Sequence, residues 1–224
     1  MDRNFLPRVS RWTFLALGAA MLSTGAGCAL FTPIGWIVTD GKDKAAEYTK
    51  NDGLEGKTVA VVCREIGTSS FENAHVPANL AEAVAALLQQ NVKHIKIVDP
   101  RKVADWTDNN SNRDQSYAEI GKNLEADVVV GIDLEDFRLR DGPTLYRGKA
   151  QVTLRVIDLK DPEMGESTWS KRIPQVQYPW LTPVPADVEL AQFRREFIGE
   201  LAKQIARKFY AHASSDDYAL ARAN

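Results

Sequence analysis

The pattern of apolar and polar residues divides most of the chain into strands and helices. Two continuous, β-branched runs at residues 58–63 and 128–132 predict strands that are buried on both faces. Residues 95–98 predict a further short strand. Residues 150–156 alternate apolar and polar side chains with period two, which predicts a half-exposed strand that pairs with residues 167–173 as an antiparallel hairpin.

Three helices are expected between and after these strands. Pro77 opens the first, in which apolar residues recur at helical spacing as far as Leu88. We expect Asp114 to cap the second helix and Asp187 to cap the third, which is long and amphipathic. No helix or strand is predicted for the proline-rich segment 174–185. The predicted order β-α-β-α-β-β-β-α is an α/β (α+β) fold, a single three-layer-like domain with a mixed five-stranded sheet and covering helices.

Two segments, each with characteristic residues at the ends of a helix or strand, resemble a known family. In residues 124–131 a helix ending in Ala126–Asp127 leads directly into an apolar strand that closes on Gly131. In residues 154–169 a strand ending in Asp158 is followed by a glycine turn and a strand that bears Trp169. Over residues 56–209 the chain resembles the amino-terminal domain of TolB, a fold shared by the exported lipoproteins LpoB and CsgG. This resemblance implies the fold rather than any one activity.

The amino terminus has the order of a bacterial lipoprotein signal peptide. Three arginines within the first eleven residues precede an apolar stretch, residues 12–22, that is too short to span a bilayer. Small residues then lead to Cys28, although Gly25 stands where Leu is usual. We expect cleavage before Cys28 and its lipidation, palmitate included, with the outer membrane favoured because Ala29 rather than Asp follows. An uncleaved membrane anchor is the alternative.

These signals predict four regions. They are a signal peptide at residues 1–27, the lipidated Cys28 with a tether at residues 28–55, the folded domain at residues 56–212, and a disordered tail at residues 213–224. Removal of the signal peptide removes three Arg and one Asp, so the formal charge of −2 becomes −4. A mildly acidic, periplasm-facing domain has no electrostatic basis for binding nucleic acid.

Candidate catalytic or metal-binding residues are few. Cys63 ends the first strand and is expected to be a core thiol, with His75 as the nearest base in the sequence. Glu65, Glu72 and His75 could supply metal ligands from one loop, but their irregular spacing favours a solvated loop. Asp133 and the carboxylates that follow it are expected at a solvated strand end. The sequence therefore predicts a protein without cofactor or metal that is not an enzyme.

Aromatic residues mark the candidate partner-binding surface. Trp169, Tyr178 and Trp180 lie on or just after the predicted hairpin, where they either contact a partner or cap the core. We expect a lipid-anchored envelope protein that acts as a non-catalytic interaction, assembly or accessory module for an envelope protein complex, and a homo-oligomer is also compatible. The alternatives are a ligand-binding or enzymatic α/β domain that uses the loop at residues 64–76, or an oligomeric secretion component.

Overall fold

The computed structural model of the chain describes residues 43–67, 73–110, 116–160, 168–215 and 217. The chain divides into two compact units, residues 1–40 and 41–224, and the description below concerns the second. The expected signal peptide and Cys28 lie outside the described residues. Within the described ranges, no helix is long and apolar enough to cross a membrane.

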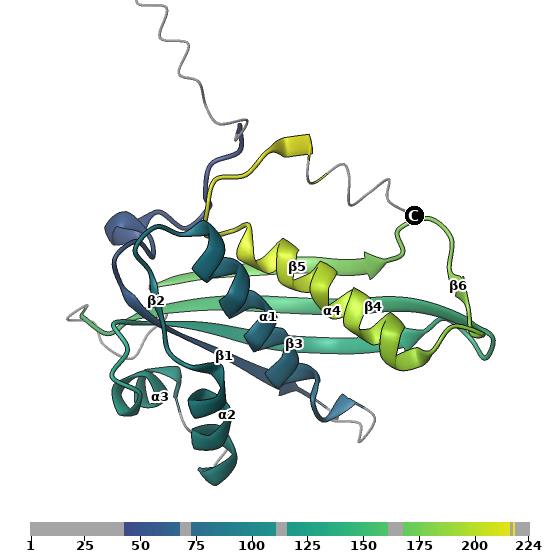
Figure 1. The fold of residues 1–224 in the computed structure, drawn as a ribbon, viewed down its shortest axis with the longest axis horizontal. Coiled ribbons are helices and arrows are strands. Elements are labelled where there is room, and N and C mark those ends of the chain that lie inside the picture. Colours follow the sequence, from purple (N-terminus) through teal and green to yellow (C-terminus); the bar gives the residue numbers. More distant parts are fainter. Residues whose placement is uncertain (1–42, 68–72, 111–115, 161–167, 216, 218–224) are drawn as a thin grey trace, which may run out of the picture. The chain divides into compact units, whose positions relative to one another are not determined.

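A mixed β-sheet runs through the domain (Figure 1). Its strands are β1 (Thr58–Ile66), β2 (Lys96–Ile97), β3 (Val128–Arg140), β4 (Leu145–Asp158), β5 (Trp169–Tyr178) and β6 (Val184–Pro185). The spatial order is β2-β1-β3-β4-β5, and β6 pairs with the start of β4 beyond the end of β5. β1 is parallel to β2 and β3, whereas β3, β4 and β5 are successively antiparallel. The predicted α/β fold with a mixed sheet is confirmed, with one strand more than expected.

Helices cover both faces of the sheet. They are α1 (Val76–Asn91), α2 (Pro100–Asn109), α3 (Tyr117–Asn123) and α4 (Leu190–Ala206). Alternate residues of β1 show the division: Val59 and Val61 join the core beneath α1 and α4, while Ala60 and Val62 join a smaller core beneath α2 and α3. The continuous apolar run of β1 is therefore explained by burial on both faces.

The sequence analysis missed α2 and misplaced two helix starts. Asp99 directly follows the strand predicted at residues 95–98, and its side chain accepts a hydrogen bond from the backbone N–H of Arg101 at the start of α2. The cap of α3 is Ser116, which forms a reciprocal capping box with Glu119, and Asp114 lies outside the described residues. Glu189 rather than Asp187 precedes α4, and its side chain makes no capping hydrogen bond.

The first part of the proline-rich segment continues an edge strand. β5 extends through Pro174 to Tyr178 and pairs with β4 on one side, so the missing N–H of proline removes no hydrogen bond from the interior of the sheet. The pairing slips by one residue here, since Pro174 and Gln175 together oppose Gln151. A proline and a bulge are devices that prevent an edge strand from pairing with other chains.

Part of the expected tether belongs to the folded domain. Tyr48 and Leu54, both assigned to the tether by the sequence analysis, are each only 1% exposed and join the main core. The ring of Tyr48 contacts those of Trp169 and Phe209 edge to face, with centroids 5.7 and 6.1 Å apart. The folded part therefore begins upstream of Gly56.

The two ends of the described chain are joined to each other. Lys44 and His212 exchange both backbone hydrogen bonds as an isolated antiparallel bridge. Asp43 accepts hydrogen bonds from Ser214, and Asp217 forms an ion pair with Lys44 at 2.6 Å. Residues that the sequence analysis placed in a disordered tail thus contact the segment that leads into the domain. Residues 216 and 218–224 lie outside the described ranges.

We expect Tyr48→Ala to destabilise the domain by about 3–5 kcal/mol, because it removes a fully buried ring that contacts two other aromatic rings. Urea unfolding followed by circular dichroism measures this loss. Tyr48→Phe is the matched control: the buried hydroxyl has no hydrogen-bond partner among the described residues, so its removal should be close to neutral. Unchanged stability of Tyr48→Ala would show that this segment is only a tether.

Candidate functional site

Two of the three aromatic residues singled out in the sequence cap the core. Trp169 packs edge to face against both Tyr48 and Phe209. Tyr178 lies against Phe193 of α4, with ring centroids 5.9 Å apart, and its hydroxyl donates to Glu196 at 3.3 Å. Their main contacts are therefore internal.

Trp180 differs from the other two because it is exposed. Trp180 and Leu181 occupy the turn between β5 and β6 and are 55% and 63% exposed. Side chains from the adjoining strands hold the backbone of this turn, since Gln177 donates to the carbonyl of Trp180 at 3.1 Å and Arg147 to that of Leu181 at 3.2 Å. An ordered turn thus presents two large apolar side chains to solvent. Sequence reasoning missed Leu181, although its position directly after Trp180 in an unassigned loop was the available signal.

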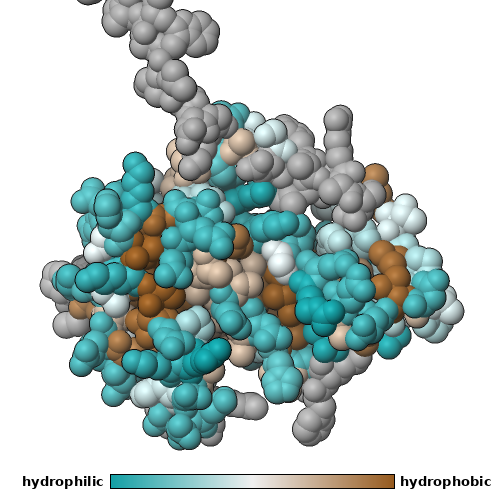
Figure 2. Space-filling view, viewed as in Figure 1, coloured by the Kyte–Doolittle hydropathy of each residue, from teal (hydrophilic) through white to brown (hydrophobic). Residues whose placement is uncertain are grey.

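The exposure of Trp180 and Leu181 is high compared with that of other large hydrophobic side chains among the described residues. On the face shown in Figure 2, hydrophilic residues predominate and the hydrophobic ones form separate small groups. Across the described residues, the large hydrophobic side chains that are exposed are Ile66, Leu145, Trp180 and Leu181. Trp180 and Leu181 are the two most exposed of these and are adjacent in the chain.

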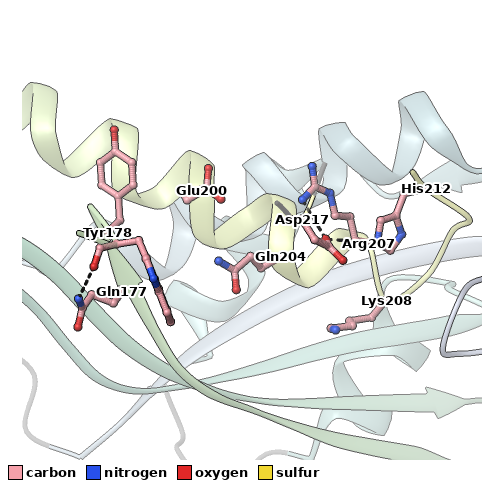
Figure 3. A pocket seen from close by; sticks show the side chains of 9 residues that line it. Gln177, Tyr178, Glu200, Gln204, Arg207, Lys208, His212 and Asp217 are labelled. Atoms are coloured by element: carbon pink, nitrogen blue, oxygen red, sulfur yellow. Dashed lines mark hydrogen bonds and ion pairs between the residues drawn. The ribbon is translucent and has the colours of Figure 1, made fainter. Parts of the chain in front are cut away.

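A groove of about 340 Å³ lies beside this turn (Figure 3). Tyr178 and Trp180 line it from β5 and the turn, while Glu200 and Gln204 line it from successive turns of α4. Further along, Arg207, Lys208, His212 and Asp217 complete its charged part. The groove therefore joins an aromatic wall to a row of polar side chains, and sequence reasoning did not identify it.

The basic side chains of the groove have acidic partners. Arg207 and His212 lie 3.3 and 3.4 Å from the same carboxylate oxygen of Asp217. Lys208 lies 2.7 Å from Glu47, which comes from the opposite end of the described chain. Burial would raise the pKa of Asp217, but Lys44 and His212 outweigh burial and hold this pKa below its ordinary value. The positive charge along the groove is thus balanced internally.

Glu200 is the exception in the electrostatics of the groove. It is only 8% exposed, and its Oε1 is buried without a hydrogen-bond partner among the described residues. Burial raises the pKa of Glu200, and neither Lys203, 3.6 Å from Oε2, nor Arg207 fully offsets this effect. A buried carboxylate oxygen without a donor is costly, so its presence calls for an explanation.

A larger hollow of about 740 Å³ lies at the carboxyl end of β1, between α1 and α2. Cys63, Glu65 and His75 line it together with mainly apolar side chains, and Glu72 lies outside the described residues. Burial raises the pKa of the Cys63 thiol, which opposes formation of a nucleophilic thiolate. The described ranges contain no group of three His, Cys, Asp or Glu side chains that could hold a metal ion. The hollow has the size of a ligand site, but its described lining assigns no chemistry.

Asp133 departs from the solvated strand end that its sequence suggested. It lies within β3, where its carboxylate accepts a hydrogen bond from the Tyr117 hydroxyl at 2.6 Å and pairs with Arg155 at 2.7 Å. Glu135 shares this face and binds Thr153 and Arg172 from β4 and β5. Each carboxylate is satisfied by fixed donors, so this network joins neighbouring strands rather than forming an acid–base pair.

Comparisons with known proteins assign no family. No family model and no curated protein matches the sequence. Among solved structures, the chain is similar to the lipoprotein GNA1162 from Neisseria meningitidis, at 12% identity and a TM-score of 0.42, covering 66% of this chain and 97% of that one. A PelC dodecamer from Paraburkholderia phytofirmans matches at 13% identity and a TM-score of 0.41, covering 75% and 95%.

The similar structures also include LpoB, which belongs to the group that the sequence resembles. The LpoB C-terminal domain from Salmonella enterica matches at 14% identity and a TM-score of 0.35, covering 56% of this chain and 86% of that one. These identities and TM-scores are too low to transfer a function, so the function is argued from the residues of this chain.

We expect Glu200→Gln to make stability less dependent on pH. Because the pKa of Glu200 is raised in the folded state, ionisation costs stability as pH rises from the ordinary value of 4.5 through the folded-state value. Gln cannot ionise, so the variant should match the wild type at pH 4 and exceed its stability at pH 8, as measured by urea unfolding. Glu82→Gln on the exposed side of α1 is the control and should show no such divergence. A constant difference between Glu200→Gln and the wild type at every pH would contradict this assignment.

Proposed function

We propose that this chain is a lipid-anchored bacterial envelope protein that acts as a non-catalytic protein–protein interaction module. The observation that carries the proposal is the ordered turn that exposes Trp180 and Leu181. Trp is among the residues most enriched at the energetic centre of protein interfaces. Because hydrogen bonds already fix the backbone of this turn, binding would lose little conformational entropy.

The anchor complements this surface. Residues 29–42 separate Cys28 from the start of the described domain, and a fully extended chain of that length spans at most about 50 Å. Attachment at Cys28 would confine the domain to a thin layer next to the membrane and raise the local concentration of membrane-bound partners. A contact of modest affinity through one turn would then suffice for function.

The three aromatic residues have different roles in this proposal. Trp169 and Tyr178 stabilise the domain, and Trp180 contacts the partner together with Leu181. The proline and the bulge in β5 disfavour the addition of a partner strand along this edge. Side-chain docking at the turn is therefore the preferred mode.

We expect Cys28→Ala to abolish membrane retention of the processed protein, because it removes the atom that carries the lipid. Fractionation of cells, followed by immunoblotting and intact-mass measurement, tests this. The wild type should be found in the membrane fraction with its lipid mass added. A Cys28→Ala variant of processed size that stays with the membrane would refute lipidation as the anchor.

We expect Trp180→Ala to weaken partner capture about tenfold or more while leaving the thermal transition unchanged, since an exposed interface Trp contributes to binding and not to the core. Affinity purification of the lipidated protein from its own membrane, with quantitative mass spectrometry, identifies the partner and measures its recovery. Trp169→Ala is the matched control and should lower the melting temperature. Unchanged recovery with Trp180→Ala would contradict the proposal.

The second candidate is ligand binding in the hollow between α1 and α2. Its volume of about 740 Å³ and the position of Glu65 and His75 in its lining favour this candidate. Trp180 does not line the hollow. A small-molecule function there would survive Trp180→Ala, so the same variant distinguishes the two candidates.

A further inference from the structure

We propose that the hollow between α1 and α2 binds an extended, apolar peptide segment of a partner protein, which adds to the edge of β1 as a further strand. The peptide would continue the line of β2 and pair with the backbone of Cys63 and Glu65. This inference rests on the second candidate function, ligand binding in the hollow, and gives that candidate a class of ligand. It does not depend on the turn that bears Trp180, which does not line the hollow.

β2 covers only the beginning of one edge of β1. β1 has nine residues and β2 has two, and the register between them ends where Val59 lies opposite Ile97. On its other side, β1 pairs with β3 without interruption as far as Ile66. Beyond Val59, the edge of β1 that faces β2 therefore has no paired strand among the described residues (Figure 1).

The backbone of this edge decides what the hollow can bind, because the side chains that line it assign no chemistry. Successive residues of a strand direct their N–H and C=O groups to opposite sides. The carbonyl of Val59 accepts a hydrogen bond from the residue after β2, and that of Thr58 accepts one from the residue before β3. Cys63 and Glu65 lie at even spacing from Val59, so their backbone groups point to the side of β2. In the described ranges, no backbone group pairs with them there.

These backbone groups border the hollow and can be reached from it. The hollow is lined by every residue from 61 to 67, so it lies along the edge of β1 rather than over one face of the strand. Val61 is only 3% exposed, whereas Cys63 and Glu65 are half-buried and Gly67 is exposed. The accessible part of the edge therefore begins at Cys63, where a short extended segment can form hydrogen bonds with both residues.

The walls of the hollow determine which side chains the peptide carries. Ala78 and Ala81 line the hollow from α1, and Val103 and Ala104 line it from α2. An added strand directs alternate side chains to its two faces, so one set meets α1 and the other meets α2. Strands that are covered on both faces are continuous apolar runs rich in β-branched residues. The peptide that fits is therefore apolar on both faces rather than amphipathic.

The two edges of the sheet differ in the features that oppose strand addition. β5 carries Pro174 and a bulge, which disfavour pairing with another chain. β1 contains no proline, and its register with β3 has no irregularity. A regular, uncovered strand edge with pockets on both sides is the arrangement that recognises extended peptides by main-chain hydrogen bonds.

The test uses the detergent-solubilised full chain and the peptide acetyl-Lys-Val-Val-Val-Val-Lys-amide, with a counterpart in which every valine is N-methylated. N-methylation removes the backbone donors and keeps the side chains. Isothermal titration calorimetry should show saturable binding of the unmodified peptide at or below millimolar concentration and none of the methylated peptide. Hydrogen exchange followed by NMR should show that the bound peptide slows exchange of the amides of Cys63 and Glu65.

Glu65→Pro tests the backbone directly, because it removes the N–H that faces the hollow and leaves the hydrogen bonds between β1 and β3 in place. It should weaken binding about tenfold or more, whereas Glu65→Ala, which changes only the side chain, should bind as the wild type does. Ala78→Glu places a charge against the apolar peptide and should weaken binding to a similar extent. Ala86→Glu, at an exposed position of α1 outside the hollow, is its control. Thermal melts should show that all variants are folded.

Equal binding of the two peptides, or unchanged binding by Glu65→Pro, would overturn the inference. Loss of binding by Glu65→Ala would also overturn it, because recognition would then belong to the side chain. Residues 68–72 of this chain, which follow Gly67, are the competing occupant. Phe71→Ser should bind the peptide as the wild type does, and binding tightened about tenfold would overturn the assignment to a partner.

The outcome is separable from that of the docking turn. Trp180→Ala should leave peptide binding unchanged, since Trp180 does not line the hollow. If no peptide binds but Trp180→Ala weakens partner capture, strand addition fails and the docking function stands. If the peptide binds and Trp180→Ala leaves capture unchanged, the docking function fails instead.

Discussion

The pairing of β3 with β4 is the interaction on which the rest of the domain depends. β3 is parallel to β1 on one side and antiparallel to β4 on the other, so it joins the α/β half of the chain to the hairpin half. Its register places Leu134 opposite Val152 on the face covered by α1 and α4, and Asp133 opposite Thr153 on the other face. A slip of one residue would exchange these faces and bury the Asp133 network in the apolar core. Correct pairing of these strands therefore determines both the core and the outer polar face.

The exposed edge of the sheet follows from the same arrangement. β4 pairs with β3 along most of its length, and its other side carries β5 and then β6. β5 must end where β6 begins, and the chain crosses between them through the turn that bears Trp180 and Leu181. α4 then packs beside this edge, and its flank forms the second wall of the groove. The position of the candidate site is thus a consequence of strand order.

The sequence predicted the elements whose signals are local. The apolar runs of β1 and β3 identified buried strands, and the apolar stripe of α4 identified a core helix. α2 was missed because most of its residues are polar and Val103 is its only buried one. The continuation of β5 through Pro174 was missed because a proline argues against a strand unless that strand is known to lie at an edge, and edge position depends on the whole sheet. Tyr48 was assigned to the tether because its partners Trp169 and Phe209 are distant in sequence.

The candidate site could likewise be predicted from the sequence only in part. Trp180 could be chosen from the sequence as an aromatic residue in an irregular segment, but only the structure separates it from Trp169 and Tyr178, which pack inward. Glu200 gave no sequence signal, because a polar residue next to the apolar stripe of a helix is ordinarily solvated. It becomes buried when the edge of the sheet lies beside that flank of α4.

The burial of Glu200 without a donor to Oε1 lowers the stability of the domain while contributing no packing that glutamine could not provide. Natural sequences tend to retain such local costs where a functional group requires them. Glu200 lines the same groove as the exposed Trp180, so this local cost lies beside the candidate partner-binding turn.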